Sequence, residues 1–261
     1  MIVALNQISA VIICCNEEAK IEGALKSLQG IADETVIVDS GSHDRTIDIC
    51  RHYTDRIFQK HWEGYRRQKQ YATDQARYDW TLSLDADEVV SPELHSELTQ
   101  WRCAPPEHHA GYFLPRKTYF MGRWIEHTSW YPDWQLRLFR RSAGRWEGGH
   151  VHESFKVSGT AGRLRGHLYH YTYSNLSEFV QQLDNFSSLA AADLFDRGVH
   201  ARLFHIVANP PLVFLKNYIL RRGFRDGAQG LVVSILSSAS TLFKYLKLWE
   251  LQHRQREKGK Q

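Results

Sequence analysis

Two aspartates one residue apart, Asp85 and Asp87, directly follow the apolar run at 82–84. Alternate side chains of an extended segment point the same way, so both carboxylates can face one crevice. Carboxylate oxygens are the ligands that hard divalent cations such as Mg²⁺ and Mn²⁺ prefer. The pair indicates a metal site at a strand end. Because acidic turns after strands are common, the pair needs supporting context.

Two further strand ends carry polar residues, at 16–18 (Asn-Glu-Glu) and at 39–44. Asp39 can accept a hydrogen bond from a nucleotide base or ribose, and Gly41 permits close approach of a ligand to the backbone. The structural alternative is a capped loop between a strand and a helix, since Ser42 and Asp44 are good capping residues. Three polar ends at one sheet edge favour a ligand site.

The elements that must position these groups alternate over the first 90 residues. Strands are predicted at 9–15, 35–38, 56–58 and 80–84, and helices at 17–28, 45–52 and 65–76. This βαβαβαβ order predicts an α/β fold with a Rossmann-like, mostly parallel sheet. Ligands of such sheets bind beyond the carboxyl ends of the strands, where the acidic groups lie.

After residue 100 the pattern changes. Three short β-like runs broken by Gly, Trp and His predict a mixed-sheet region, at 111–116, 135–140 and 168–173. From Leu176 the chain turns helical, and Pro210-Pro211 interrupts the helical pattern. The tail after His253 is expected to be unstructured.

Charge is unevenly distributed along the chain. The net charge is +4, but the segment from residue 202 onward holds 11 Lys/Arg and 3 Asp/Glu, a net of +8. Basic residues among apolar ones are typical of helices that lie on an anionic membrane surface. A solvated hairpin packed on the domain is the alternative, and no compact nucleic-acid-binding motif is present, so no nucleic-acid partner is expected. The longest uncharged run, 227–243, falls short of the ~20 apolar residues that a spanning helix needs.

The cysteines and the N-terminus bear on location. The four cysteines form no CxxC pair, and no basic segment followed by an apolar stretch opens the chain. We therefore expect a reducing, cytoplasmic compartment.

Taken together, the motifs resemble family 2 glycosyltransferases of the GT-A fold. The motifs that carry this resemblance are Cys15-Asn16-Glu17-Glu18, Val38-Asp39-Ser40-Gly41-Ser42 and Leu84-Asp85-Ala86-Asp87. Later segments resemble the bacterial lipopolysaccharide-core branch, which adds β-linked glucose to an inner-core heptose. These segments are Trp130-Tyr131-Pro132-Asp133, Arg137-Leu138-Phe139-Arg140, Val151-His152-Glu153 and His170-Tyr171-Thr172-Tyr173. The resemblance covers nearly the whole chain and implies UDP-glucose as donor.

The resemblance also implies roles for individual residues. Asp39 would hydrogen-bond the uracil or ribose, with Glu17 nearby, and Lys69 would lie near the donor on its helix. Asp85 would contact the ribose or metal-bound water. Many members have a second Asp where this chain has Ser40, a departure that leaves Asp39 in place.

The same resemblance implies Asp87 as the main ligand of Mg²⁺ or Mn²⁺, with His170 completing the metal site. A histidine in an aromatic strand is otherwise usually a core residue.

The family's Glu-Asp base motif is missing from this chain. The segment 151–153 stands in its place, which makes Glu153 the candidate general base, with Glu147 and Asp133 as the next candidates. His150 and His152 could orient the base or relay a proton.

From these features we expect a GT-A catalytic domain at 1–173, with a nucleotide-sugar half at about 1–100 and an acceptor half at about 101–173, followed by a helical, basic, membrane-associated region at 174–261. The expected enzyme is inverting and peripheral on the inner face of the inner membrane. It transfers glucose from UDP-glucose to a lipopolysaccharide inner-core heptose.

Three alternatives remain open. The enzyme could use another sugar or another glycan or lipid acceptor. It could be a nucleotidyltransferase, although these usually carry a Gly-rich basic loop near the first strand, where this chain has Asn-Glu-Glu. It could also be a non-catalytic sugar- or lipid-binding module.

Overall fold

The computed structural model describes residues 5–103, 108–149, 153–173 and 175–258. The chain forms two compact units. Unit 1 comprises Met1–Lys117, Asp133–Gly148 and His152–Tyr171, and unit 2 comprises Thr118–Pro132, Gly149–Val151 and Thr172–Gln261.

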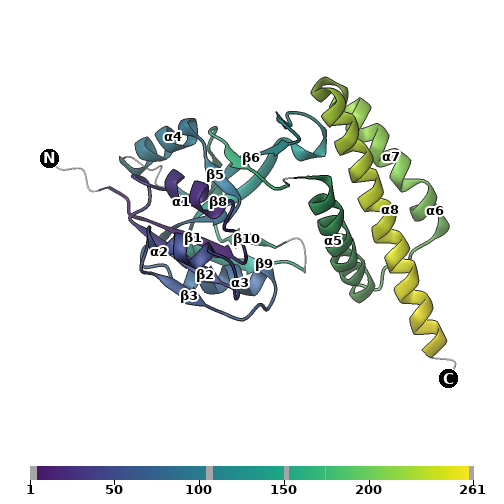
Figure 1. Cartoon of the computed structure of the whole chain (residues 1–261), viewed down its shortest axis with the longest axis horizontal. Helices are drawn as coiled ribbons and strands as arrows, with labels where there is room; N and C mark the ends of the chain where they lie inside the picture. Colours follow the sequence, from purple (N-terminus) through teal and green to yellow (C-terminus); the bar gives the residue numbers. More distant parts are fainter. Residues whose placement is uncertain (1–4, 104–107, 150–152, 174, 259–261) are drawn as a thin grey trace. The chain divides into compact units, whose positions relative to one another are not determined.

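The sheet of unit 1 starts from four parallel strands in the order β3-β2-β1-β4 (Figure 1). They are β1 (Ile8–Cys14), β2 (Glu34–Asp39), β3 (Ile57–Gln59) and β4 (Trp80–Asp85). Each predicted parallel strand is therefore present, with boundaries shifted by a residue or two. β-branched and apolar residues fill these short runs, as expected for strands buried on both faces.

The sheet then becomes mixed, as the sequence predicts. β8 (Asp133–Arg140) pairs antiparallel with β4, and β6 (His109–Phe120) pairs antiparallel with β8. The order continues through β12 (Leu168–His170) to β5 (Glu88–Val90), while β11 (Thr160–Arg163) and β7 (Arg123–Trp124) pair with β6. β9 (Gly144–Glu147) and β10 (Ser154–Val157) form a separate hairpin.

Helices cover both faces of the parallel strands. Ile8, Ala10 and Ile12 of β1 belong to a core shared with α1 (Ile21–Ser27), α2 (Thr46–Arg51) and α4 (Pro92–Cys103). Val11, on the opposite face of the same strand, packs with Ala72 of α3 (Tyr65–Asp74). The alternation of strand side chains thus buries both faces, which is the doubly wound arrangement.

The first helix begins later than predicted. The sequence favours a helix from Glu17, but α1 starts at Ile21. Asn16 adopts a left-handed conformation with φ of 56°, and the Glu17 amide donates to the Thr46 hydroxyl at 2.7 Å. Residues 16–20 therefore form a turn at the sheet edge, where backbone groups are available for a ligand.

Unit 2 is mainly helical. Its elements are α5 (Leu176–Asp196), α6 (Leu203–Val207), α7 (Asn209–Leu215), the π-helical turn η3 (Lys216–Leu220), the 3₁₀ turn η4 (Gly223–Asp226) and α8 (Gly227–Lys258). Pro210 and Pro211 lie in the first turn of α7, where a missing amide is tolerated. α5 and α7 each pack against α8 within this unit (Figure 1).

One prediction for the C-terminal part is wrong. The tail after His253 is helical to Lys258, and i,i+4 pairs such as Arg254–Glu250 support this last stretch. The helical stretch Gly223–Glu257 is also long and apolar enough to cross a membrane, judged by length and composition alone, although its uncharged run is short.

Candidate active site

The polar ends of β1, β2 and β4 meet at one edge of the sheet, as the sequence predicts. Cys14 is opposite Asp39 in the β1–β2 pair, and Ile13 is opposite Asp85 in the β1–β4 pair. The residues that follow these strands therefore leave the sheet side by side. This edge is where ligands of open α/β sheets bind.

Asp39 is fully buried and holds its own loop. Its carboxylate accepts from the Gly41 amide at 3.0 Å and from the amide and hydroxyl of Ser42. Gly41 has φ of +100°, a conformation that favours glycine. The Gln68 amide donates to the Ser40 hydroxyl at 2.8 Å, which ties the loop to α3. Asp39 is thus held in a fixed position. The alternative interpretation, a capped loop between strand and helix, is correct in part, because Asp39 also holds the loop that follows it.

The loop after β1 is tied to the loop after β2. The Asn16 amide donates to the Ser42 hydroxyl at 2.9 Å, and the His43 amide donates back to the Asn16 side chain at 2.8 Å. Next to these residues, burial raises the pKa of Glu17 to about 7, and the nearby carboxylates of Asp87, Asp44 and Asp85 act in the same direction. Glu17 can therefore change its charge near neutral pH.

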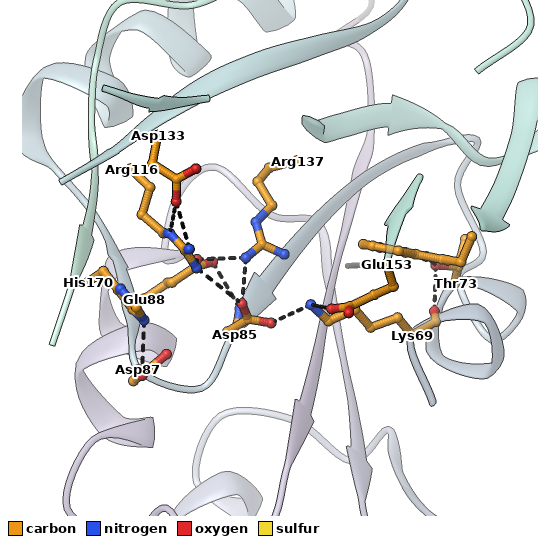
Figure 2. Close-up of polar contacts among 11 residues, drawn as sticks. Lys69, Thr73, Asp85, Asp87, Glu88, Arg116, Asp133, Arg137, Glu153 and His170 are labelled. Atoms are coloured by element: carbon orange, nitrogen blue, oxygen red, sulfur yellow. Dashed lines mark hydrogen bonds and ion pairs between the residues drawn. The ribbon is translucent and has the colours of Figure 1, made fainter. Parts of the chain in front are cut away.

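Asp85 lies among three cationic side chains (Figure 2). Its two carboxylate oxygens contact Lys69, at 2.9 Å, and Arg137, and Arg116 lies 3.8 Å away. Burial alone would raise the pKa of Asp85, but these cations outweigh burial and hold that pKa well below its usual range. Asp85 is therefore a fixed, ionised carboxylate whose charge is already neutralised by protein cations.

Glu88 supports this arrangement from within the core. It is fully buried, and one of its oxygens lies 2.6 Å from Arg137 and 3.2 Å from Arg116. Its other oxygen accepts from the Asp85 amide at 3.0 Å. Arg116 also contacts Asp133 at 2.6 Å. Sequence reasoning assigned no role to Glu88 or to either arginine, although Arg137 lies in a segment that carries the family resemblance. The available signal was a charged residue, Arg137, inside an apolar strand pattern.

Asp87 points away from these arginines and toward His170 (Figure 2). Its carboxylate lies 3.2 Å from the His170 Nε2 atom, because β12 pairs with β5 and places His170 opposite Glu88. Burial opposes ionisation of Asp87, yet His170 outweighs it, so the pKa of Asp87 lies below its usual value. In the described part of the chain no group of three or more His, Cys, Asp or Glu side chains is arranged around a metal position.

The three carboxylates considered as general base have different surroundings. Glu153 is 11% exposed and lies 2.9 Å from Lys69, which itself contacts Asp85. Glu147 is 45% exposed and pairs with Arg145, and Asp133 is bound by Arg116. Glu153 and Asp133 therefore each share a cation with Asp85, and Glu153 has the closer link, because Lys69 lies 2.9 Å from Asp85 and Arg116 lies 3.8 Å from it. His150 and His152 lie outside the described residues.

Lys69 is placed by α3 and an aromatic ring. It is almost fully buried, and its ammonium lies over the Trp146 ring at 5.2 Å. The Trp146 indole N–H donates to the Thr73 hydroxyl, one turn further along α3. This packing aims Lys69 at Asp85 and Glu153, a link that spacing in the sequence could not reveal.

Tyr65, at the start of α3, is a further residue to which sequence reasoning assigned no role. Burial raises its pKa to about 12, and the carboxylates of Asp85, Glu153, Asp87 and Glu17 add to this effect. The ring of Trp62 packs edge-on against Tyr65 at 4.7 Å. Two aromatic rings thus lie beside the acidic cluster, an arrangement often used to contact sugars and bases. Tyr65 lies one turn before Lys69, and that spacing was the available signal.

Comparison with known proteins adds a family match. The model of the family described as "Glycosyl transferase family 2" matches residues 9–171. The lipopolysaccharide core biosynthesis glycosyltransferase LpsC of Rhizobium meliloti is 31% identical over 250 residues, covering 93% of this chain and 92% of that protein. An uncharacterized glycosyltransferase of Rickettsia typhi is 29% identical over 259 residues, covering 95% and 88% of the two chains.

Among solved structures, the mannosyltransferase PcManGT of Pyrobaculum calidifontis, in complex with GDP-Man and Mn²⁺, has a similar fold. Its TM-score is 0.53 at 12% identity, covering 94% of this chain and 87% of that one. The fold of this chain is therefore GT-A, as predicted.

Proposed function

The chain belongs to glycosyl transferase family 2, and we propose that it is an inverting enzyme that transfers glucose from UDP-glucose to an inner-core heptose of lipopolysaccharide. The observation that supports this most is the division of the acidic edge into two parts. Asp87 with His170 forms one part, and Glu153, held by the cation that also binds Asp85, forms the other. A donor site next to a general base is what glycosyl transfer requires.

The first part suits a divalent cation. Asp87, in the turn between β4 and β5, and His170, at the end of β12, offer one carboxylate and one imidazole, and the diphosphate of a nucleotide sugar can supply further oxygen ligands. Mn²⁺ accepts imidazole more readily than Mg²⁺ does, and Mn²⁺ accompanies GDP-Man in the similar mannosyltransferase. A bound cation supplies neutralisation of the charge that develops on the diphosphate leaving group.

The donor would bind across the neighbouring strand ends. Asp39 and Glu17 are proposed to contact uracil and ribose, and Asp85, already neutralised by Lys69 and Arg137, to hold the ribose. A carboxylate locked by buried cations changes little on ligand binding, so its geometry is set in advance.

The second part supplies the base. Inversion requires the acceptor hydroxyl to attack from the face opposite the diphosphate, and a carboxylate must take its proton as the bond forms. Glu153 is proposed for this step. Its contact with Lys69, at 2.9 Å, holds the carboxylate in place. A positioned base of this kind typically contributes ~10²–10⁴-fold to the rate.

The acceptor proposal is supported by the relative LpsC, whose name assigns it to lipopolysaccharide core biosynthesis. An acceptor built on lipid A is displayed at the inner face of the inner membrane, so we place the enzyme there. Residues 1–173 would form the catalytic domain and 174–261 the basic region that attaches to the membrane.

The test uses the purified protein with Mn²⁺ and lipopolysaccharide truncated after the inner-core heptoses. Transfer of one hexose from UDP-glucose is expected, with UDP as the second product. Parallel reactions with UDP-galactose, UDP-N-acetylglucosamine and GDP-mannose test the donor. Faster transfer from another donor would overturn the glucose assignment.

Further reactions separate the alternative classes. With UTP and glucose 1-phosphate as substrates, formation of UDP-glucose and pyrophosphate would indicate a nucleotidyltransferase. The absence of any turnover, together with tight sugar binding, would indicate a binding module. Analysis of the core oligosaccharide from a strain that lacks this protein gives an independent answer, because the missing residue identifies donor and acceptor.

A further inference from the structure

A continuous apolar stripe is exposed along the segment α6–α7–η3 of unit 2. The backbone stays helical through both junctions, at Ala208 and Lys216. Phe204, Val207, Pro211, Leu215 and Ile219 recur every three or four residues, so they share one side of this helical segment.

The exposure of this stripe is large. Phe204 is 65% exposed, Val207 69%, Leu215 50% and Ile219 50%. At the two ends of the segment, Leu203 and Leu220 are 79% and 77% exposed. Contiguous apolar surface of this kind on a soluble protein marks an interaction site.

The opposite side of the same segment is packed within unit 2. Pro210 and Asn217, seven residues apart, are buried, and the Ser238 hydroxyl of α8 donates to the Pro210 carbonyl at 2.8 Å. Where the chain turns back into α8, a Cβ atom on Gly230 would collide with the Gly223 carbonyl oxygen, so this turn lies directly against the start of α8. The buried side of the segment is thus packed, and the stripe forms its outer side.

The charges that accompany the stripe are of one sign. The span 202–225 contains five basic residues, at 202, 216, 221, 222 and 225, and no acidic residue. Lys216, Arg222 and Arg225 are exposed. The acidic residue that follows, Asp226, is buried and accepts from the backbone and ring of His127. The surface therefore combines apolar side chains with an uncompensated positive charge.

We propose that this stripe inserts into one leaflet of an anionic membrane, with Lys216, Arg222 and Arg225 at the level of the lipid headgroups. The charge favours this occupant. A second copy of the chain would bring the same basic residues together and repel, whereas anionic lipid attracts them. The inference rests on the proposed function in one respect only, namely that the membrane carries the acceptor.

The test uses the full chain and sedimentation with vesicles that contain no glycan, so lipid binding is measured independently of transfer. Vesicles of phosphatidylglycerol and phosphatidylethanolamine should bind the protein, and phosphatidylcholine vesicles should bind at least tenfold less. Binding should weaken between about 0.1 M and about 1 M salt, where the Debye length falls from ~10 Å to ~3 Å, and a salt-resistant fraction should remain.

The decisive variant replaces Phe204, Val207 and Leu215 with serine. We expect at least a tenfold loss of binding to anionic vesicles and loss of the salt-resistant fraction. The matched control, Leu176→Ser with Val180→Ser, changes two exposed apolar residues of α5 and should bind like the wild type. A Phe204→Trp variant should show a blue-shifted emission that brominated lipid quenches.

Three outcomes would overturn the inference. Vesicle binding unchanged by the serine triple variant would show that the stripe does not insert. A wild-type dimer that the triple variant turns into a monomer would show that the stripe joins two copies. Resistance of the wild type to alkaline extraction would indicate a spanning α8. If instead the stripe behaves as proposed but no hexose is transferred, only the proposed function fails.

Discussion

The ammonium of Lys69 lies 2.9 Å from the carboxylate of Glu153, a residue 84 positions further along the chain. The same ammonium lies 2.9 Å from Asp85, so one cation joins a carboxylate of the donor edge to the candidate base. Lys69 is almost fully buried, and water screens such a link only weakly. Lys69 therefore connects Asp85, proposed to hold the donor, with Glu153, the candidate base.

Glu153→Gln should abolish transfer and leave donor binding nearly intact. Glutamine keeps the shape and can still accept from Lys69, but it cannot take the acceptor proton. The expected loss in kcat is ~10²–10⁴-fold, while UDP-glucose affinity measured by calorimetry should change only slightly. Glu147→Gln, at an exposed pair with Arg145, is the control. An active Glu153→Gln beside an inactive Glu147→Gln or Asp133→Asn would reassign the base.

Asp87→Ala should remove turnover without unfolding the protein. Asp87 contacts His170 at the sheet edge and fills no part of the apolar core, so circular dichroism should stay native-like. Binding of Mn²⁺ in the presence of UDP, followed by electron paramagnetic resonance, should be lost. The control variant Asp79→Ala, which removes a half-exposed pair with Arg140, should retain both turnover and Mn²⁺ binding. Full wild-type activity in metal-free buffer would contradict the metal assignment.

Arg137→Met should destabilise the fold strongly at neutral pH. It leaves Glu88 fully buried without its closest cation and weakens the hold on Asp85, and breaking a buried pair costs about 3–5 kcal/mol. Arg137 helps to hold the pKa of Asp85 below its usual range in the folded protein. The stability that comes from ionised Asp85 is therefore fully present above the pKa of Asp85 in the unfolded chain, ~3.9, and is lost as pH falls through its pKa in the folded protein.

Urea unfolding checks both statements about Arg137. The difference between wild type and Arg137→Met should be largest near neutral pH and should shrink in acid. Arg140→Met removes an exposed pair and is the matched control, with an expected cost of about 1 kcal/mol or less. A difference that stayed the same from neutral pH into acid would show that Arg137 stabilises the fold by packing and not by its charge.

UDP affinity should rise with pH through neutrality. The pKa of Glu17 is raised to about 7 by burial, and only its ionised form can act purely as an acceptor toward the nucleotide. Below this pKa the ionised fraction grows up to about tenfold per pH unit, so affinity should increase from about pH 6 to about pH 8 and then level off. Calorimetry without divalent cation isolates this effect from metal binding.

Two variants check the pH prediction. Glu17→Gln should flatten the profile, whereas Glu18→Gln, at the exposed neighbouring position, should preserve it. A rise that persists in Glu17→Gln would assign the titration to another group.

Reversal of charge at Lys216, Arg222 and Arg225 should weaken binding to anionic vesicles by at least tenfold, since each basic residue near such a surface contributes ~1 kcal/mol. UDP affinity should not change. Arg221 is a poorer choice because its guanidinium donates to the Thr128 carbonyl at 3.2 Å, so a change there would also disturb unit 2. Binding unaffected by the reversal would show that these residues serve another purpose.

The part of the site built by consecutive elements follows from the sequence. β1, β2 and β4 are short apolar runs that end in turn residues, and the parallel order brings Asp39 and Asp85 to one edge. The local sequence pattern is sufficient to predict these strand ends, because each end is set by the residues of that strand and of the turn that follows it. The GT-A fold and the family were predictable for the same reason.

The partners of those carboxylates were not predictable in this way. Arg137 and Glu88 meet only because β8 pairs antiparallel with β4, and register between distant strands leaves no local signal. The apolar stripe of the C-terminal segment shows a different limit. Helical spacing alone favours burial of Phe204 and Leu215, and only the packing of Pro210 and Asn217 shows that the stripe faces out.

The outward display of the stripe also bears on regulation. Phe204, Val207 and Leu215 are already 50–69% exposed, so attachment needs no rearrangement that uncovers them. A surface that is always displayed has no closed state for an effector to stabilise. How much enzyme resides on a bilayer would then be set by the supply of anionic lipid, by mass action, and attachment would need no trigger.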